Sequence, residues 1–282
     1  MNMGGLHLLF LSRNFLQIEQ EPKSTTQGQP PAYWPATGEL HVKNLCASYS
    51  PDGPEILHDL SFYIKSGERI GVVGRTGSGK SSLAFSLLRC IYTTGEVTYG
   101  GIPISSLKLE SLRSNITIIP QVPELISGTL RQNLDPFEEA DDLILNDALR
   151  AAGLDSLQED MAVDKDKLVL DTVVFSNGSN LSVGQRQMVA LVRALVRRNY
   201  KTDNIIQRSL HQELKDDVTL ITIAHRLHTI MDYDKIMVLD AGNMVEFGAP
   251  SELLIQNDGV FRAMVNESDD KEALYALTRD GV

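Results

Sequence analysis

Residues 69 to 88 read "RIGVVGRTGSGKSSLAFSLL", and this stretch combines a strand, a glycine-rich loop and a helix. The run from Arg69 to Gly74 has the apolar composition of a buried parallel strand. The run from Lys80 onward has helical spacing. Between them, "GRTGSGKS" at 74–81 fits the pattern G-x-x-x-x-G-K-[ST]. A loop of this pattern between a strand and a helix predicts a site that holds phosphate groups, a P-loop.

The loop supplies three kinds of group to the expected phosphate site. Its glycines let the backbone curl so that successive N–H groups point inward, at the positive end of the following helix. Lys80 adds a point charge for the outer phosphates, Ser81 supplies a hydroxyl group to Mg²⁺, and Ser82 can assist at the first phosphate. A glycine-rich turn without a ligand is the alternative. The predicted binding set is Gly74, Arg75, Thr76, Gly77, Ser78, Gly79, Lys80, Ser81 and Ser82.

Three regions surround this loop along the chain. Residues 1–38 form an N-terminal segment and a linker rich in Pro, Gln, Thr and Gly. From Glu39, two β-rich runs separated by the turn "SPDGP" predict a small antiparallel sheet. Helical spacing in "DDLILNDALRAAGL" (141–154) and "GQRQMVALVRALVRR" (184–198) predicts a helical lobe over about 122–198.

The remaining apolar runs complete an α/β fold with a mostly parallel central sheet. Two of them, "NITIIPQ" at 115–121 and "VTLITIAH" at 218–225, predict further buried parallel strands. "KIMVLDAGNMVEFG" at 235–248 predicts a hairpin that turns at "AGN". The main domain is expected to cover 39–265, followed by an acidic tail, 266–282, that is either a solvated end or a short helix.

Composition and charge exclude several classes of protein. With 282 residues, 42% of them hydrophobic and 22% charged, the chain has the composition of an ordinary globular protein. A net charge of -11 opposes non-specific attraction to nucleic acid, so no such partner is expected. Cys46 and Cys90 have no paired spacing, which suits a reducing compartment. The apolar run "LHLLFL" at 6–11 is far shorter than the roughly 20 residues of a membrane span, so we expect a soluble chain without a signal peptide.

A second motif, "LSVGQRQ" at 181–187, resembles the signature of the ATP-binding-cassette (ABC) transporters. With Val183 in third place it resembles the multidrug-resistance-associated subfamily. This resemblance covers about residues 39 to 265 and implies a P-loop NTPase fold that binds ATP and Mg²⁺. It also implies that Tyr49 stacks on adenine, that Gln121 contacts Mg²⁺ and the attacking water, and that His225 contacts the γ-phosphate.

The resemblance also implies partners. The run Leu181–Gln185 is expected to start a helix whose N–H groups, with the Ser182 hydroxyl, form a second anion site. In the family this site serves the ATP of another cassette, and two cassettes pack head to tail. The signature set is Leu181, Ser182, Val183, Gly184 and Gln185. Transmembrane domains of an exporter would be the other partners, which places a docked chain at the cytoplasmic face of a membrane and an isolated chain in the cytoplasm.

One element of the family pattern is missing at the junction of Asn199 and Tyr200. Relatives usually have a dozen to fifteen more residues there, which include an apolar strand ending in Asp and a Glu that polarises the attacking water. We expect the missing strand to flank the P-loop strand. Asp240, in "IMVLD", and Asp203 are possible substitutes, but Asp240 matches the family's next strand and Asp203 follows no strand. His225, Gln121 and Lys80 remain as catalytic candidates, without a general base.

Three functions therefore compete. The chain is the ATP-hydrolysing cassette of an exporter, a nucleotide-binding module that closes on ATP without hydrolysing it, or an inactive truncated product. The first reading needs an acid that replaces the missing pair. The second and third follow from the missing stretch.

Overall fold

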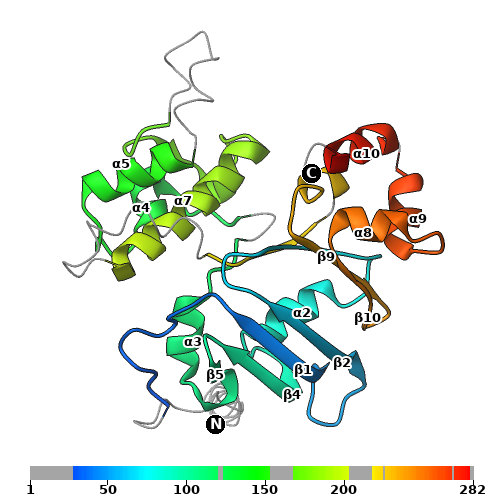
Figure 1. Ribbon diagram of the computed structural model, residues 1–282. Helices are drawn as coiled ribbons and strands as arrows, with labels where there is room; N and C mark the ends of the chain where they lie inside the picture. Colours follow the sequence, from blue (N-terminus) through cyan, green and yellow to red (C-terminus); the bar gives the residue numbers. More distant parts are fainter. Residues whose placement is uncertain are drawn as a thin grey trace, which may run out of the picture. The chain divides into compact units, whose positions relative to one another are not determined.

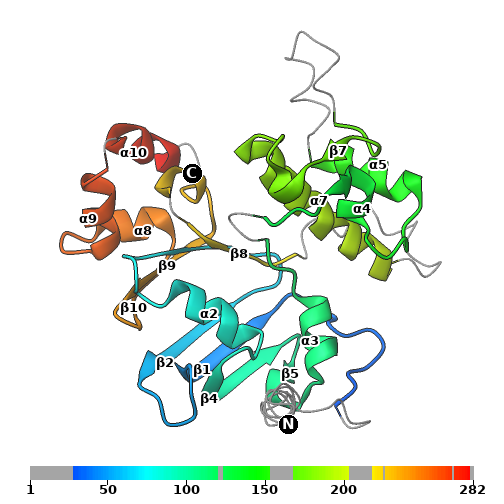
Figure 2. The same ribbon diagram turned by 180° about the vertical axis from the view of Figure 1, so that it is seen from behind.

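The computed structural model describes residues 28–119, 123–152, 168–202, 218–224, 226–268 and 270–279. They fall into two compact units, one from the chain up to Asn115 together with Asp217 onward, and the other from Ile116 to Asp216. In the described residues the first unit contains two four-stranded sheets and the second is mainly helical. Figures 1 and 2 show both units from opposite sides.

The first sheet is antiparallel and confirms the sheet predicted from Glu39 onward. Strand β1 (Leu40–Ser48) lies between β2 (Glu55–Ile64) and β4 (Tyr92–Tyr99), and the short β5 (Ile102–Pro103) pairs with β4. Side chains of β2 alternate between buried and exposed in its second half, as expected for a sheet with one face on a core. Figure 2 shows helix α2 (Lys80–Leu87) beside these strands.

Part of the segment interpreted as a linker contributes to this unit. Trp34 is 7% exposed, and its indole N–H donates a hydrogen bond to the Tyr99 carbonyl oxygen at 2.9 Å. The two rings meet edge to face, with centroids 5.3 Å apart. The linker interpretation did not include this core side chain.

The second sheet is the predicted, mostly parallel one. Its strand order is β10-β9-β3-β8, and β3 (Arg69–Val73) runs parallel to both β8 (Leu220–Ile223) and β9 (Lys235–Asp240). The predicted hairpin is confirmed, since β9 pairs with β10 (Asn243–Gly248) across a two-residue turn. Both turn residues have positive φ, 44° at Ala241 and 80° at Gly242, as a tight hairpin of this kind requires.

This strand order corrects the expected place of the missing strand. The P-loop strand β3 already has a neighbour on each side, so the missing strand cannot flank it. Within the described residues β8 has β3 as its one sheet neighbour, and an added parallel strand would fit beside β8. Its four residues are apolar or Thr, yet Leu220 is 40% exposed and the other three are half-buried.

The strand predicted at 115–121 is wrong for the residues that the structure describes there. Residues 116–119 form no strand, and Ile118 and Ile119 are 47% and 43% exposed. An apolar run becomes a strand only when a neighbouring strand accepts its backbone hydrogen bonds and covers its side chains. Composition alone predicted the strand, but composition does not supply that neighbour.

Three helices close the first unit at its C-terminal end, and Figure 1 shows them together beside β9 and β10. They are α8 (Pro250–Ile255), α9 (Val260–Asn266) and α10 (Lys271–Arg279). Phe261 and Leu274 are buried in the same cluster as Ile236 of β9. Of the two forms expected for the tail after 266, a short helix is therefore present, and Leu274 anchors it.

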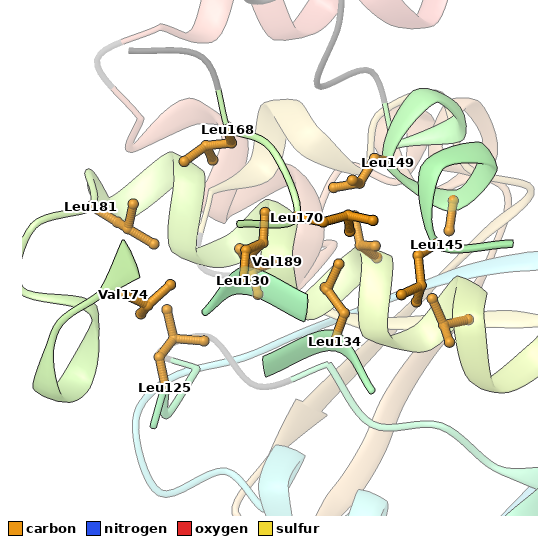
Figure 3. Packing of buried hydrophobic residues seen from close by; sticks show 13 residues of the cluster. Leu125, Leu130, Leu134, Leu145, Leu149, Leu168, Leu170, Val174, Leu181 and Val189 are labelled. Atoms are coloured by element: carbon orange, nitrogen blue, oxygen red, sulfur yellow. The ribbon is translucent and has the colours of Figure 1, made fainter. Parts of the chain in front are cut away.

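The second unit confirms a helical subdomain. Its helices are α4 (Leu130–Leu134), α5 (Asp142–Ala151) and α7 (Val183–Thr202), with a short two-stranded sheet of β6 (Gly128–Thr129) and β7 (Val173–Val174). Figure 3 shows its core, in which leucines of α4 and α5 pack with Leu170, Val174 and Val189. Helix α7 continues through the Asn199–Tyr200 junction without a break. The other short helices among the described residues are η1 (Ile104–Ser106), α3 (Leu109–Asn115), η3 (Ser176–Gly178) and η6 (Leu227–Thr229).

Candidate functional site

The P-loop joins the carboxyl end of β3 to the first turn of α2, and its conformation depends on glycine. Gly74, Gly77 and Gly79 have φ values of 150°, 83° and 102°, which L side chains rarely adopt. A Cβ atom at Gly74 would lie 2.2 Å from the Leu239 carbonyl oxygen, so the loop packs closely on β9. A Cβ atom at Gly77 would meet nothing within 4 Å, so the loop is open on that side.

The loop carries backbone hydrogen-bond donors that have no acceptor within the described part of the chain. Ser78 N–H donates to the Arg75 carbonyl oxygen at 3.1 Å, which closes the curl of the loop. Among the described residues, the N–H groups of Gly77 and Gly79 have no acceptor. Unpaired backbone donors at the start of a helix are the groups that bind phosphate oxygens, so the loop fits the ligand that its sequence predicts.

Lys80 lies over its own loop. Its Nζ atom donates hydrogen bonds to the carbonyl oxygens of Gly74 at 2.7 Å and Arg75 at 2.8 Å, and lies 3.5 Å from Ser78 Oγ. Burial lowers the pKa of the Lys80 ammonium group from its ordinary value. The two hydrogen bonds hold the ammonium group at the loop, where a phosphate oxygen would be a stronger acceptor than a carbonyl oxygen.

Tyr49, predicted to stack on adenine, lies next to the loop's helix. Its hydroxyl group forms a 3.1 Å hydrogen bond with Ser82 Oγ in the first turn of α2. Ser82 is 5% exposed, whereas the tyrosine is 55% exposed. Ser81, the predicted magnesium ligand, is exposed in the same helical turn. The structure thus brings Tyr49, Ser81 and Ser82 together with Lys80.

The signature motif forms the N-terminus of α7 in the second unit. Leu181 is buried in the core of that unit, and the helix begins at Val183 rather than at Leu181. Ser182 and Gln185 cap the helix reciprocally, because Ser182 N–H donates to Gln185 Oε1 at 2.8 Å and Gln185 N–H donates to Ser182 Oγ at 3.1 Å. Val183 is 60% exposed at this end. The S-x-x-Q spacing of this capping box is a signal that is present in the sequence.

The structure does not place every predicted site residue. Gln121, His225 and Asp203 lie outside the described residues. Asp240 is exposed at the end of β9, where it pairs with Asn243 in the hairpin. No group of three or more His, Cys, Asp or Glu side chains in the described part of the chain can hold a metal ion. Ser81 is therefore the one predicted magnesium ligand whose position is known.

Comparison with known proteins identifies the family. The family model described as ABC transporter matches residues 57–200, which include both the P-loop and the signature. The chain belongs to the ABC transporter family. It is an ATP-binding cassette of this family, and its fold is that of the nucleotide-binding domain in an ABC exporter. The solved structure of a bacterial Atm1-family ABC exporter with ATP bound matches 93% of the cassette with a TM-score of 0.75 at 28% identity, over 46% of that chain.

Relatives of this cassette are much longer proteins of the multidrug-resistance-associated type. The ATP-binding cassette transporter abc4 of Schizosaccharomyces pombe is 44% identical over 90% of this chain, and ATP-binding cassette sub-family C member 2 of Rattus norvegicus is 43% identical over 90%. The cassette spans 18% and 17% of their lengths. No helix in the described part of the chain is long and apolar enough to cross a membrane.

The alignments also bear on the length of the cassette. The match with the rat protein extends over 268 positions, but 90% of this 282-residue chain is about 254 residues. About 14 aligned positions therefore have no residue in this cassette, and the same difference for abc4, aligned over 271 positions, is about 17.

Proposed function

We propose that this cassette binds MgATP through its P-loop, Lys80, Ser81 and Tyr49, and that it couples nucleotide binding to the movement of an exporter's transmembrane domains. The observation that carries the proposal is that the Gly77 and Gly79 N–H groups have no acceptor among the described residues, in the loop to which the Lys80 ammonium group is hydrogen-bonded. Adenine stacking on Tyr49 would fix the other end of the nucleotide.

Each residue has one task in this site. The loop's N–H groups bind phosphate oxygens, and Lys80 exchanges its carbonyl acceptors for the outer phosphates. Ser81 offers its hydroxyl oxygen to the metal, while Ser82 holds the Tyr49 ring beside the helix. Bound Mg²⁺ would supply neutralisation of the phosphate charge. Gln121 and His225 are proposed to contact the metal and the γ-phosphate.

Calorimetry tests the binding site directly. Wild-type cassette should bind MgATP, and Lys80→Ala should abolish measurable binding because it removes the charge at the outer phosphates. Lys43→Ala is the matched control, since Lys43 is an exposed lysine of β1 in the same unit. Equal affinity in the wild type and in Lys80→Ala would overturn the assignment.

We propose also that the signature end of α7 serves the ATP of a second cassette packed head to tail. Its capping box leaves the exposed Val183 and Gly184 at the end of the helix, where a phosphate can approach. Light scattering should show association that requires ATP and that Ser182→Arg removes. A dimer that forms equally well without ATP and in the Ser182→Arg variant would contradict this pairing. The natural second cassette would be the other one of an exporter, at the cytoplasmic face of the membrane.

A non-hydrolysing role is the second candidate. The alignments with the rat protein and abc4 include about 14 and 17 positions without a residue in this cassette, and the family pattern has a dozen to fifteen more residues at the Asn199–Tyr200 junction. If they are the strand with its Asp and Glu, the chain binds and releases ATP without a general base. Asp240 is no evident replacement, because it belongs to the hairpin next to β3.

A further inference from the structure

The turn between β9 and β10 contacts the P-loop through a single residue. Gly242 N–H donates a hydrogen bond to the Ser78 carbonyl oxygen at 3.1 Å, and the Gly242 carbonyl oxygen accepts one from His58 N–H at 2.9 Å. The two backbone groups of Gly242 thus link the P-loop to β2. Residues 78, 242 and 58 are far apart in the sequence, so no local pattern predicts this link.

The first of these bonds fixes a peptide plane of the phosphate site. In a trans peptide, the carbonyl oxygen of one residue and the N–H of the next point in opposite directions. Because the Ser78 carbonyl is held toward Gly242, the Gly79 N–H must point away from the turn. This N–H has no acceptor among the described residues. The turn therefore orients a donor that is available to a phosphate oxygen.

The contact leaves no room for a side chain at Gly242. A Cβ atom there would lie 2.1 Å from the Ile56 carbonyl oxygen and 2.8 Å from His58 Cδ2. The first neighbour is backbone of β2, which cannot shift cheaply, so an added methyl group must displace the turn. A displaced turn no longer presents its N–H to Ser78. The same hairpin touches the loop at a second point, Leu239 against Gly74.

We propose that Gly242 is a positioning residue for nucleotide binding, which aims the Gly79 N–H at a phosphate oxygen by holding the Ser78 carbonyl. This inference rests on the proposed function of the P-loop. Gly242 itself does not touch the nucleotide. Its effect on affinity passes through one hydrogen bond and one peptide plane.

A matched pair of variants separates this role from the general cost of changing a turn glycine. Gly101 is the second residue of the two-residue turn between β4 and β5, with φ of 77° against 80° for Gly242. A Cβ atom at Gly101 would meet nothing within 4 Å. Gly101→Ala and Gly242→Ala therefore impose similar backbone strain, and they differ in the contact with the loop and β2.

Titration of the folded chains with MgATP by calorimetry gives the first readout. Gly242→Ala should weaken binding at least about 10-fold, the effect of losing one hydrogen bond to a charged group, whereas Gly101→Ala should change it less than about 2-fold. NMR of the Gly79 amide gives the second readout. A merely structural role of Gly242 would not change the response of this amide signal to MgATP. MgATP should shift this amide signal in the wild type and in Gly101→Ala, and should not shift it in Gly242→Ala.

Each outcome decides the inference. Equal loss of affinity in the two alanine variants overturns it. So does a Gly79 amide signal that MgATP shifts in Gly242→Ala as much as in the wild type. If Gly242→Ala does not fold, amide exchange of Gly242 in the wild type decides instead: MgATP should slow this exchange, and no slowing overturns the inference. A wild-type chain that binds no MgATP would overturn the proposed function as well, which distinguishes the two failures.

Discussion

At the scale of single residues, the charge of Lys80 favours ATP binding but disfavours folding. Burial lowers the pKa of its ammonium group below the ordinary value of 10.5, so its charged form is less favourable in the folded chain than in the unfolded one. We expect Lys80→Met to lose ATP affinity by about 100-fold or more, as for two charge-assisted hydrogen bonds of about 1.5–3 kcal/mol each. Without nucleotide, its free energy of unfolding should equal or exceed that of the wild type.

The pH dependence of this difference follows from the direction of the shift. The cost of the buried charge is present in full below the folded-state pKa, and it disappears as the pH rises toward the unfolded value. Urea unfolding of the wild type and Lys80→Met should therefore show a stability advantage of the variant at neutral pH that shrinks in the alkaline range. An advantage that grows with pH would contradict this assignment.

Tyr49 allows the ring and the hydroxyl group to be tested separately. Tyr49→Ala should weaken ATP binding by roughly 10-fold, because stacking of a base on an aromatic ring contributes about 1–3 kcal/mol. Tyr49→Phe keeps the ring and loses only the bond to Ser82, so its affinity should stay close to that of the wild type. Titration with a fluorescent ATP analogue measures both. Equal losses in the two variants would show that the hydroxyl group, and not the ring, carries the contact.

A phosphate site can be predicted from the spacing of the P-loop residues, because each group is supplied within one short segment. The link through Gly242 could not be predicted, since it depends on the approach of residue 242 to residue 78 in the folded chain. The sequence predicts that Ser182 lies at an anion site. Its S-x-x-Q spacing is that of a capping box, and in the structure the Ser182 hydroxyl oxygen does cap its own helix.

At the scale of elements, Asn133 joins α4 to the segment before it and to α7. It is 2% exposed, and its side chain bonds to both backbone groups of Ile126 and to the Thr129 carbonyl oxygen. Arg193 of α7 donates to Asn133 Oδ1 at 3.0 Å and to the Asn133 carbonyl oxygen at 2.5 Å. Removing this amide would leave several partly buried polar groups without this partner.

We therefore expect Asn133→Ala to lower the free energy of unfolding by about 2–4 kcal/mol, at about 1–3 kcal/mol for each buried group left unsatisfied. Asn146→Ala in α5 is the control, because Asn146 makes a single hydrogen bond to the carbonyl oxygen one turn earlier. Its effect should stay within about 0.5 kcal/mol. Urea unfolding followed by circular dichroism compares the two. Similar losses at both positions would mean that the Asn133 contacts do not stabilise the unit.

The strands show where prediction from sequence stops. The hairpin at 235–248 was predicted correctly because the turn residues and the strand residues on each side of them are close together in the sequence. The order of strands in a parallel sheet is not local, so the missing strand was assigned to the wrong neighbour. For the same reason Ile118 and Ile119 were expected in a strand that residues 116–119 do not form.

An insertion at the Asn199–Tyr200 junction tests the place of the missing strand. An apolar strand ending in Asp-Glu should add beside β8, raise the urea midpoint, and increase phosphate release. The same insert ending in Asn-Gln is the matched control: it should raise the midpoint equally and leave phosphate release at background. A midpoint unchanged by either insert would contradict the assignment of β8 as the accepting edge.

At the scale of the whole molecule, we expect binding without efficient turnover. Loss of a positioned general base costs about 10² to 10⁴-fold in rate, or roughly 3–5 kcal/mol of barrier. Glutamine has no useful basicity, and His225 would have to act as base while contacting the γ-phosphate. Steady-state phosphate release from the purified chain should be near background. Turnover of order 1 s⁻¹, typical of slow enzymes, that disappears in Lys80→Ala would show that another acid has taken over.

The chain's one tryptophan is Trp34, and it is packed on Tyr99 in the first unit. Its fluorescence consequently reports on that unit, while far-ultraviolet circular dichroism reports on the helices and strands of both units. Denaturation followed by both signals needs no label. Coincident transitions would mean that the two units melt as one cooperative body, and separated transitions that each melts alone. The fluorescence of this single tryptophan thus measures whether the first and the second unit unfold together.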